Sequence, residues 1–282
     1  MTALRDRRDR CPGALRPWLA ADGLLVRLRL VGGQVSRDQL LSLAAVAQEY
    51  GDGRIHLTGR ANLQLRGLPG TGDRLSEEVL TALEGTGLLP TRSHELVRNV
   101  LVSPATGLAG GRADLRPVAA DLDRLLCASP GLADLPGRFL FVLEDGRGDL
   151  LDRDCDLGLV ALDGTRAQLR VGETWGEVVP LHRAAVTLVA LAEDFRVARG
   201  TGDQAPWHVR ELTRPLRPAR EPDPGLPSPS PPLPHGPVPG GRHVAVPDGG
   251  LDRDALSSLT ARRLVVTPWR GILVPDQGTP HV

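Results

Sequence analysis

Apolar residues and arginines alternate near the start of the chain. Residues 24–30 read LLVRLRL, so Arg27 and Arg29 fall on one side and aliphatic residues fall on the other. A period of two residues predicts a half-buried β-strand with both guanidinium groups on its polar face.

A helix and two more strand segments are predicted after this strand. Ser36 and Gln39 form a capping-box pattern, and leucines and alanines follow at helical spacing. Residues 54–57 and 63–68 then return to a strand-like pattern, separated by a polar turn. The predicted unit is therefore strand, helix, strand.

The same pattern returns near the end of the chain. The segment LDRDALSSL at 251–259 parallels VSRDQLLSL at 35–43, and RLVVT at 263–267 parallels RIHLT at 54–58. An internal repeat of this kind predicts two similar halves of a pseudo-two-fold α+β domain. The alternative is chance similarity between two amphipathic segments.

The sequence between the repeats predicts a mixed region of helices and strands. Helices are expected at 73–84, 117–127 and 181–199, and strands at 97–102, 138–144 and 168–171. Nine prolines among residues 221–240 predict an extended linker without regular structure.

The composition and the net charge of the chain limit the classes of binding partner that we expect. Among 282 residues, 34 acidic residues balance 34 basic ones, and every basic one is arginine. This balance favours neither nucleic acid nor a membrane surface as a partner, and no apolar run approaches the length of a membrane span. The cysteines Cys11, Cys127 and Cys155 form no paired motif, which is typical of a reducing compartment, so a cytoplasmic location is expected. Because lysine is absent, any anion site here is expected to use guanidinium groups.

Several arginines stand on segments that otherwise predict a core. Arg27 shares a strand with aliphatic residues, Arg60 lies in the polar turn, and Arg98 interrupts an apolar run. A guanidinium group in such a place needs a partner, because an unpaired buried charge costs several kcal/mol. If these groups converge on one cleft, they suit a ligand with several carboxylates. The alternative is a solvated, arginine-rich face of an antiparallel sheet.

Three carboxylates show an alternate spacing after residue 150. Asp152, Asp154 and Asp156 are spaced as in a calcium-binding loop, but Leu157 stands where that loop needs glycine. We therefore interpret them as a solvated turn, and we assign no metal-ligating residues.

Two segments resemble the nitrite/sulfite reductase family. Residues 11–68 contain the pattern T-x-R-x-x-x-Q from Thr58 to Gln64, and LVRNVLVSP at 96–104 supplies a distant R-N-V. Within the family, the sequence is most similar to the branch that contains precorrin-3B synthase of aerobic cobalamin biosynthesis. The resemblance extends to residues 242–274, and it therefore also accounts for the internal repeat.

The resemblance implies an α+β fold with two ferredoxin-like half-domains related by pseudo-two-fold symmetry, plus an α/β haemoprotein-type middle domain. The predicted domains are the first half-domain at 1–75, the middle tetrapyrrole-type domain at 76–210, a proline-rich linker at 211–240 and the second half-domain at 241–282.

The resemblance also implies residues that bind the carboxylates of a tetrapyrrole. Arg27 matches the family arginine on the first strand, and Arg60 and Gln64 match the motif residues. Asn62 lies beside them, and Asn99 belongs to the distant pair. These five residues are the expected cofactor-binding set.

Two further arginines are implied as catalytic residues. Arg98, with Asn99, matches the arginine–asparagine pair on the substrate-binding side of sirohaem. Arg138 matches the first lysine of a cationic stretch of the sulfite reductases. Leu140 stands where the second lysine would be, and this departure disfavours a true sulfite reductase.

The implied function is that of an oxidoreductase that acts on a tetrapyrrole or uses one. A precorrin-3B synthase-like enzyme would oxidise a precorrin in an oxygen-dependent step. The alternatives are a fragment of a sirohaem-dependent nitrite or sulfite reductase and a non-catalytic tetrapyrrole-binding protein. The expected ligand is therefore sirohaem or a precorrin-type tetrapyrrole, and an electron donor or a separate iron–sulfur domain is a further expected partner.

The family also uses a 4Fe–4S cluster, held by four cysteines in C-x5-C and C-x3-C pairs of a C-terminal domain. The three cysteines of this chain lack that spacing. We therefore expect the cluster ligands to be absent from this chain.

Overall fold

The computed structural model describes residues 11–276, and these residues form two compact units. Residues 11–95, together with residues 232–276, form the half-domain unit. Residues 96–231 form the central unit. The predicted domain boundaries at 75, 210 and 240 stay predictions.

The half-domain unit contains two copies of the same element order. The first copy consists of β1 (Trp18–Ala20), β2 (Gly23–Leu28), β3 (Gln34–Ser36), α1 (Arg37–Tyr50), β4 (Ile55–Leu57) and β5 (Leu63–Leu68). The second copy consists of β13 (Gly236–Val238), β14 (Gly241–Ala245), β15 (Gly250–Leu251), α5 (Arg253–Ser257), β16 (Arg263–Val266) and β17 (Gly271–Pro275). The first copy is followed by the hairpin β6 (Gly70–Thr71) and β7 (Arg74–Leu75) and by α2 (Glu77–Gly85). The predicted pseudo-two-fold relation is confirmed element by element.

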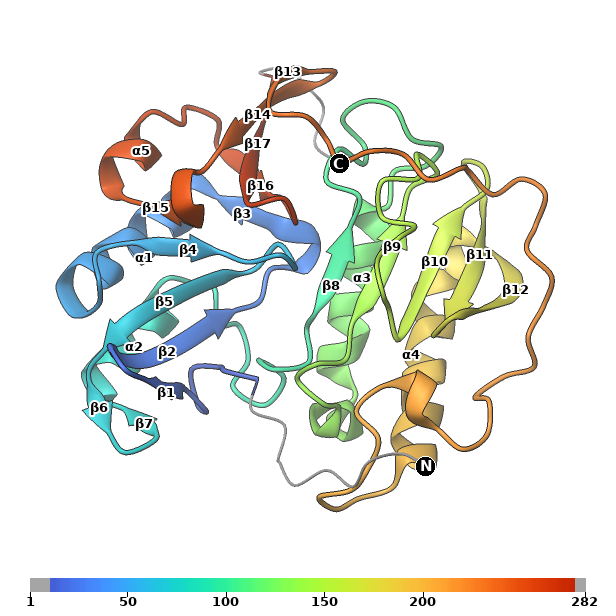
Figure 1. The fold of residues 1–282 in the computed structure, drawn as a ribbon, viewed down its shortest axis with the longest axis horizontal. Helices are drawn as coiled ribbons and strands as arrows, with labels where there is room; N and C mark the ends of the chain where they lie inside the picture. The colour runs from blue at the N-terminus through green and yellow to red at the C-terminus, as the bar shows by residue number, and fades with distance from the viewer. Residues whose placement is uncertain (1–10, 277–282) are drawn as a thin grey trace. The chain divides into compact units, whose positions relative to one another are not determined.

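Each copy gives one strand to the sheet of the other copy (Figure 1). One sheet has the order β1-β2-β5-β4-β15, and the other has the order β13-β14-β17-β16-β3. Leu251 of β15 pairs with Ile55 of β4, and Val35 of β3 pairs with Leu264 of β16. Neither sheet is complete without the other copy, so the two halves form a single folding unit.

The capping box predicted for α1 is present. The Ser36 side chain accepts from the Gln39 N–H at 3.1 Å, and the Gln39 side chain accepts from the Ser36 N–H at 3.0 Å. These bonds satisfy two backbone donors that a helix start otherwise leaves without partners. The helix buries one apolar face, which includes Leu40, Leu43 and Ala47.

A tight turn precedes the exchanged strand in both copies. Val31–Gly33 and Pro247–Gly249 are single 3-10 turns, and the middle residue of each has a positive φ, 60° at Gly32 and 53° at Asp248. At Gly33, with φ of 70°, an added Cβ would collide with the carbonyl oxygen of Val266. Glycine is therefore required there by both the backbone conformation and the close approach of β16.

The central unit is a five-stranded sheet with the order β12-β11-β10-β9-β8. Its elements are β8 (Val100–Val102), α3 (Arg116–Ala128), β9 (Phe141–Glu144), β10 (Leu157–Ala161), β11 (Arg166–Val171), β12 (Thr174–Pro180), α4 (Leu181–Arg199) and 3-10 turns at Pro130–Asp134 and Val209–Glu211. Strands β8, β9 and β10 run parallel, whereas β11 and β12 are antiparallel to their neighbours. Helices α3 and α4 pack against each other and cover one face of this sheet (Figure 1).

An aromatic cluster fills the core between α4 and the start of β9. The ring of Phe139 lies 4.9 Å from that of Phe195 and 5.2 Å from that of Phe141, measured between centroids. All three side chains are fully buried. Such edge and tilted contacts add to the stabilisation from apolar burial.

The first part of the proline-rich segment is bonded to the central unit. The Gln168 side chain donates to the Glu221 carbonyl at 2.8 Å and accepts from the Asp223 N–H at 2.8 Å. The Ser230 N–H donates to the Gly148 carbonyl at 3.0 Å. The segment is extended, and its backbone is held at several points.

One expectation about this segment is wrong. Residues 221–240 were expected to contain no regular structure, yet β13 (Gly236–Val238) lies within them. Strand β13 is at the edge of its sheet. Pro237, which has no N–H to donate, is tolerated on an edge strand because one side of that strand needs no partner.

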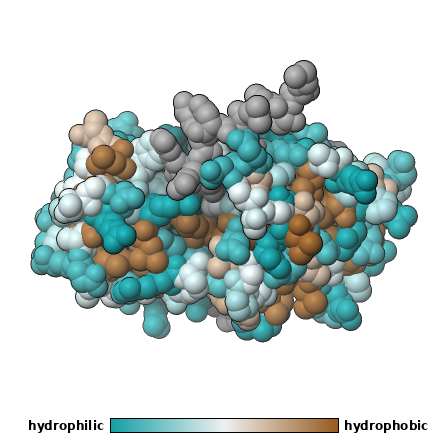
Figure 2. Space-filling model, turned by 90° about the horizontal axis from the view of Figure 1, so that it is seen from below, coloured by the Kyte–Doolittle hydropathy of each residue, from teal (hydrophilic) through white to brown (hydrophobic). Residues whose placement is uncertain are grey.

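The surface carries apolar residues in scattered places. On the face shown in Figure 2, hydrophobic residues form separate patches among hydrophilic ones. The most exposed large apolar side chains are Leu19 and Val197. Within residues 11–276, no helix combines the length and the hydropathy that crossing a membrane requires.

Candidate functional site

A row of polar side chains crosses one sheet of the half-domain unit. Gln64 of β5 lies opposite Arg27 of β2 on one side and opposite His56 of β4 on the other. Arg27 Nη2 donates to Gln64 Oε1 at 3.3 Å, and His56 Nε2 lies 2.6 Å from Asp52 Oδ2. Residues next to this row along the strands are buried, whereas the row itself is half-buried. The predicted alternation therefore produces a polar sheet face, which we call the arginine face.

The turn that carries Arg60 is held by Asn62. Asn62 is almost completely buried, and its side-chain oxygen accepts at 2.9 Å from the N–H of Leu30, two residues after the end of β2. The backbone closes the turn, since the Thr58 N–H donates to the Asn62 carbonyl at 3.0 Å. Ala61 adopts a positive φ of 55°. Asn62 therefore fixes the position of half-buried Arg60 relative to β2.

Arg29 follows the end of β2 and does not share the half-buried position of Arg27. It is buried, and its Nη1 donates to the Pro12 carbonyl at 3.1 Å. The nearby Glu95 carboxylate accepts from the Ala14 and Leu15 N–H groups at 2.6 and 2.8 Å. Burial raises the pKa of Glu95, although these hydrogen bonds and the charge of Arg29 oppose the rise. This cluster anchors the segment that precedes β1.

In the central unit, the predicted residues gather where the parallel strands begin. Arg98 and Asn99 come directly before β8, and Arg138 comes shortly before β9. The Asn99 side chain donates to the Gly137 carbonyl at 2.7 Å, which joins the starts of the two strands. We call this group, with the residues before β10, the strand-entry cluster.

Arg98 is paired with a carboxylate of α3. Its Nε donates to Asp123 Oδ1 at 2.6 Å and its Nη2 donates to Asp123 Oδ2 at 2.8 Å. Burial alone would lower the pKa of Arg98, but the two bonds to Asp123 outweigh it and the pKa is raised. The guanidinium group is therefore charged and held in a bidentate pair.

Arg138 is exposed and lies over an aromatic ring. Its guanidinium carbon is 5.2 Å from the centroid of Trp207, which is a cation–π distance. Trp207 lies in the segment after α4, and its N–H donates to Glu211 Oε2 at 2.7 Å. Leu140, two residues after Arg138, is buried. Residues 135–141 thus contribute one cation, Arg138, and no second one.

The strand-entry cluster continues with Asp156, just before β10. Its carboxylate accepts from the Leu140 N–H and from the Val209 N–H, both at 2.9 Å, and it faces His208 Nδ1 at 3.2 Å. Asp156 was expected in a solvated turn, and that expectation is wrong because its side chain is only 3% exposed. A buried carboxylate is stable there because backbone and side-chain donors surround it.

The opposite ends of β8 and β9 carry an acidic cluster. Glu144 accepts from the backbone N–H groups of Gly146 and Gly148 at 2.9 and 2.6 Å. Ser103 donates to Asp149 at 2.8 Å, and Arg147 pairs with Asp145. Burial raises the pKa of Asp149 to about 7, against the lowering effects of the Ser103 bond and the Arg147 charge.

The described residues do not fit an iron–sulfur cluster. Cys11 lies in the half-domain unit, whereas Cys127 and Cys155 lie in the central unit. Desolvation raises the pKa of the Cys155 thiol to about 11, which disfavours the thiolate that a cluster needs. In residues 11–276, no three histidine, cysteine or acidic side chains are grouped so as to hold a metal ion.

The structure thus places the predicted residues in two sets. Arg27, Arg60, Asn62 and Gln64 come together on the arginine face and its turn, and Arg98, Asn99 and Arg138 come together in the strand-entry cluster. The roles assigned to both sets stay predictions. The pair His208 and Asp156 was missed, because the two residues are 52 positions apart and the local pattern around Asp156 was interpreted as a solvated turn.

Comparison with known proteins identifies one of the domains. Residues 20–71 match the model of the family described as "Nitrite/Sulfite reductase ferredoxin-like half domain". The chain therefore contains a nitrite/sulfite reductase ferredoxin-like half domain, and the resemblance seen in the sequence is confirmed.

Two curated relatives are similar to about half of this chain. A precorrin-3B synthase from Sinorhizobium sp. is 30% identical over 146 residues, which are 50% of this chain and 29% of the relative. A ferredoxin–nitrite reductase from Synechococcus elongatus is 38% identical over 133 residues, which are 44% of this chain and 25% of the relative. The matched part thus spans less than a third of either relative.

A solved structure shows the same fold. The NirA protein of Mycobacterium tuberculosis superposes with a TM-score of 0.68 and 19% sequence identity, over 95% of this chain and 59% of that chain. The mixed α/β architecture with ferredoxin-like half-domains is therefore confirmed. At this identity the likeness concerns the fold alone.

Proposed function

We propose that this chain binds a tetrapyrrole with several carboxylates and acts as a precorrin-3B synthase-like oxidoreductase. The observation that carries the proposal is the arginine face, where Arg27 and Gln64 form a half-buried row next to the turn of Arg60. The similarity to a precorrin-3B synthase over half of the chain supports it.

The donor chemistry of the arginine face fits this ligand. A guanidinium group offers several N–H donors in one plane and holds a carboxylate through two charge-assisted hydrogen bonds. Arg27 and Arg60 would bind separate carboxylates, and Gln64 would fix Arg27 through its side-chain oxygen. Asn62, whose oxygen is bonded to Leu30, would position the turn rather than contact the ligand.

Precorrins and sirohaem carry similar acetate and propionate arms, so these donors fit both. The bound tetrapyrrole would supply the oxidisable ring or the redox-active metal. The arginine face of the half-domain unit would bind and orient it. In the central unit, Arg98 and Arg138 would have the catalytic role that the resemblance implies, through their positive charge. Because the cysteines do not fit a cluster, electrons would come from a separate donor or iron–sulfur domain.

An absorbance titration tests this function. The purified chain is titrated with sirohaem and, separately, with an octacarboxylate porphyrin that mimics the arms of a precorrin. We expect a saturable spectral shift with at least one of them. Arg27→Ala and Arg60→Ala should each weaken binding by about 10-fold, since one charge-assisted interaction contributes about 1.5–3 kcal/mol.

The matched control is Arg242→Ala. Arg242 is an exposed arginine on β14 of the same unit, and its removal should leave the dissociation constant unchanged. Equal losses in all three variants would show that only net charge matters, and would contradict the arginine face as a site. Absence of a shift with both ligands would contradict tetrapyrrole binding by this chain.

A second candidate is a non-catalytic tetrapyrrole-binding protein. It is favoured by the bidentate pairing of Arg98 with Asp123 and by the buried leucine at position 140, which leave the strand-entry cluster with less free positive charge. This protein would bind the ligand in the titration above without consuming it. Product analysis of the bound precorrin under air separates the two candidates.

A further inference from the structure

The pair of His208 and Asp156 has no part in the function proposed so far. It stands in the strand-entry cluster, because Asp156 bonds the N–H of Leu140, two residues after Arg138. His208 directly follows Trp207, whose ring lies under the Arg138 guanidinium group. The pair is therefore next to an arginine to which the family resemblance gives a catalytic role.

Asp156 fixes the orientation of the His208 ring. Both carboxylate oxygens of Asp156 lie 3.2 Å from His208 Nδ1. A carboxylate accepts hydrogen bonds, so Nδ1 must carry the proton that points to it. In the neutral ring, Nε2 is then the unprotonated nitrogen and is available as an acceptor or base.

The backbone around the ring is held as well. Glu211 Oε2 accepts from the N–H groups of Trp207 and His208 at 2.7 and 3.2 Å, and Asp156 accepts from the Val209 N–H at 2.9 Å. None of the described residues makes a hydrogen bond to His208 Nε2, and the side chain is 21% exposed. One ring nitrogen is thus anchored, and the other makes no hydrogen bond with a described residue in a side chain that is partly exposed.

A purely structural role does not require this arrangement. Asp156 already joins the start of β9 to the segment after α4 through the two backbone N–H groups of Leu140 and Val209. The imidazole adds no further connection between elements. A carboxylate that orients a histidine through Nδ1 and leaves Nε2 accessible is the arrangement that proton transfer uses.

We propose that His208 is a proton-transfer residue of the strand-entry cluster, positioned by Asp156. The inference rests on the proposed function, because it needs a ligand at this cluster. The neutral ring takes up a proton from solvent water at Nε2, gives this proton to an anionic oxygen of the ligand and returns to neutral imidazole, with Nδ1–H toward Asp156 throughout.

The charged groups around the ring set the conditions for this transfer. Asp156 faces Nδ1, Glu211 accepts from the backbone of the same segment, and Arg138 lies over the neighbouring Trp207 ring. At the edge of the cluster, Arg210 Nη1 lies 3.5 Å from Asp154 Oδ2. Among the described residues, two carboxylates and one cation thus flank the segment of His208, and the Asp154–Arg210 pair is exposed.

The first test measures the tautomer of His208 in the unmodified, ¹⁵N-labelled protein by NMR, with the ring assigned through the backbone of residues 207–209. We expect the neutral ring to carry its proton on Nδ1. A proton on Nε2 would overturn the proposal, since Asp156 would then not orient the ring as described. This test does not depend on any ligand.

The second test is calorimetric titration of the full chain with sirohaem and with an octacarboxylate porphyrin, in two buffers of different ionisation enthalpy. The heat difference gives the number of protons exchanged on binding. We expect the wild-type protein to exchange a proton and His208→Gln to lose that exchange. Glutamine still offers an N–H to Asp156, so the fold should be retained.

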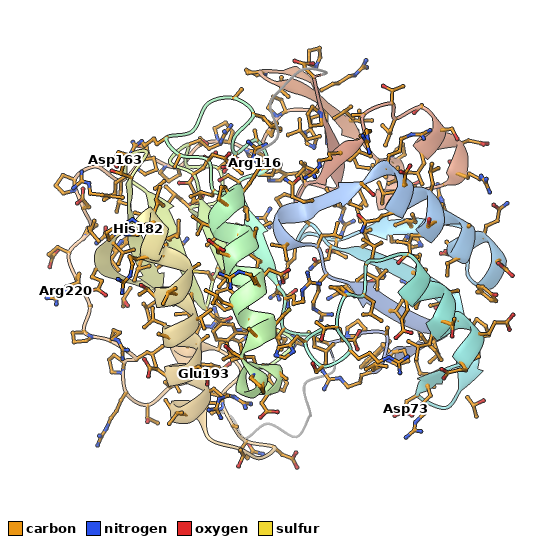
Figure 3. All side chains as sticks on the ribbon, turned by 180° about the vertical axis from the view of Figure 1, so that it is seen from behind. Asp73, Arg116, Asp163, His182, Glu193 and Arg220 are labelled. Atoms are coloured by element: carbon orange, nitrogen blue, oxygen red, sulfur yellow. The ribbon has the colours of Figure 1, made fainter. Side chains whose placement is uncertain are left out.

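His182→Gln is the matched control, because His182 is an exposed histidine on α4 of the same unit (Figure 3). It should exchange the same number of protons as wild type. Binding without proton exchange in wild type, or with equal exchange in His208→Gln, would overturn the role of His208 but leave tetrapyrrole binding intact. If neither ligand binds wild type, the proposed function itself fails and this inference fails with it.

Discussion

Arg98 and Asp123 form a bidentate ion pair, with Nε to Oδ1 at 2.6 Å and Nη2 to Oδ2 at 2.8 Å. The pair ties the segment that leads into β8 to the middle of α3. Arg98 is mostly buried, so its charge depends on Asp123 for compensation. A ligand that binds Arg98 must therefore use its remaining donors, on Nη1 and Nη2, or displace Asp123.

We expect Asp123→Asn to lower the free energy of unfolding by about 3 kcal/mol, because it leaves a buried guanidinium group without its counter-charge. Denaturant unfolding measures the change. Asp121→Asn on the same helix is the control: its pair with Arg124 is exposed on both sides, and such pairs contribute about 0–1 kcal/mol. Equal losses in the two variants would contradict the buried pairing.

Asp149 should make the stability depend on pH. Its pKa is about 7 in the folded chain and near its usual 3.8 in the unfolded chain, since burial disfavours the charged form. Between these values the folded state keeps a proton that the unfolded state has released, so stability falls as the pH rises from about 4 to 7. Asp149→Asn should equal wild type near pH 4 and be more stable at pH 8 by at least about 1 kcal/mol.

In the same series of unfolding measurements, the stability change caused by Asp163→Asn should depend on pH in the opposite direction to that of Asp149→Asn. The Thr165 side chain and backbone, followed by Arg166, lower the pKa of exposed Asp163. The Asp163 carboxylate therefore stabilises the folded chain at pH values above the pKa that Asp163 has in the unfolded chain. This stabilisation is lost on acidification. If Asp149→Asn also loses stability at pH 8, the raised pKa assigned to buried Asp149 is wrong.

Local signals accounted for much of the fold. The capping box of Ser36 and Gln39 gave the start of α1, and the predicted helix at 181–199 has the bounds of α4. Strand β10 was missed because all its residues are buried, so its sequence shows no alternation. The exchange of β3 and β15 follows from contacts between residues more than 190 positions apart, which no local pattern records.

In the candidate site, too, local patterns predicted some features, whereas others depend on residues that are distant in the sequence. The alternation around Arg27 predicted a polar face, and the structure places Gln64 beside it in that face. The partners of the central residues are distant in sequence: Arg98 pairs with Asp123, and Asp156 with His208. Periodicity places a residue on a face, whereas its partner depends on how helices and loops pack.

Asn62 should matter more for stability than its neighbour Gln64. Asn62→Ala removes the acceptor of the Leu30 N–H, and an unsatisfied buried donor costs about 1–3 kcal/mol. Gln64→Ala removes a long, half-buried bond to Arg27 and should cost less than about 1 kcal/mol. Thermal unfolding of both variants checks the order, and a reversed order would contradict the positioning role of Asn62.

The strand exchange predicts that neither half of the half-domain unit folds alone. A fragment of residues 11–95 lacks β15, the partner of β4, and leaves β3 without β16. Its ¹H–¹⁵N spectrum should show the narrow dispersion of an unfolded chain, and addition of a fragment of residues 232–282 should restore native-like dispersion. The same second fragment with Leu264→Asp is the control, because Leu264 is fully buried and pairs with Val35. Well-dispersed signals from residues 11–95 alone would show that one copy folds independently, and that the exchanged strands are not what holds the two halves together.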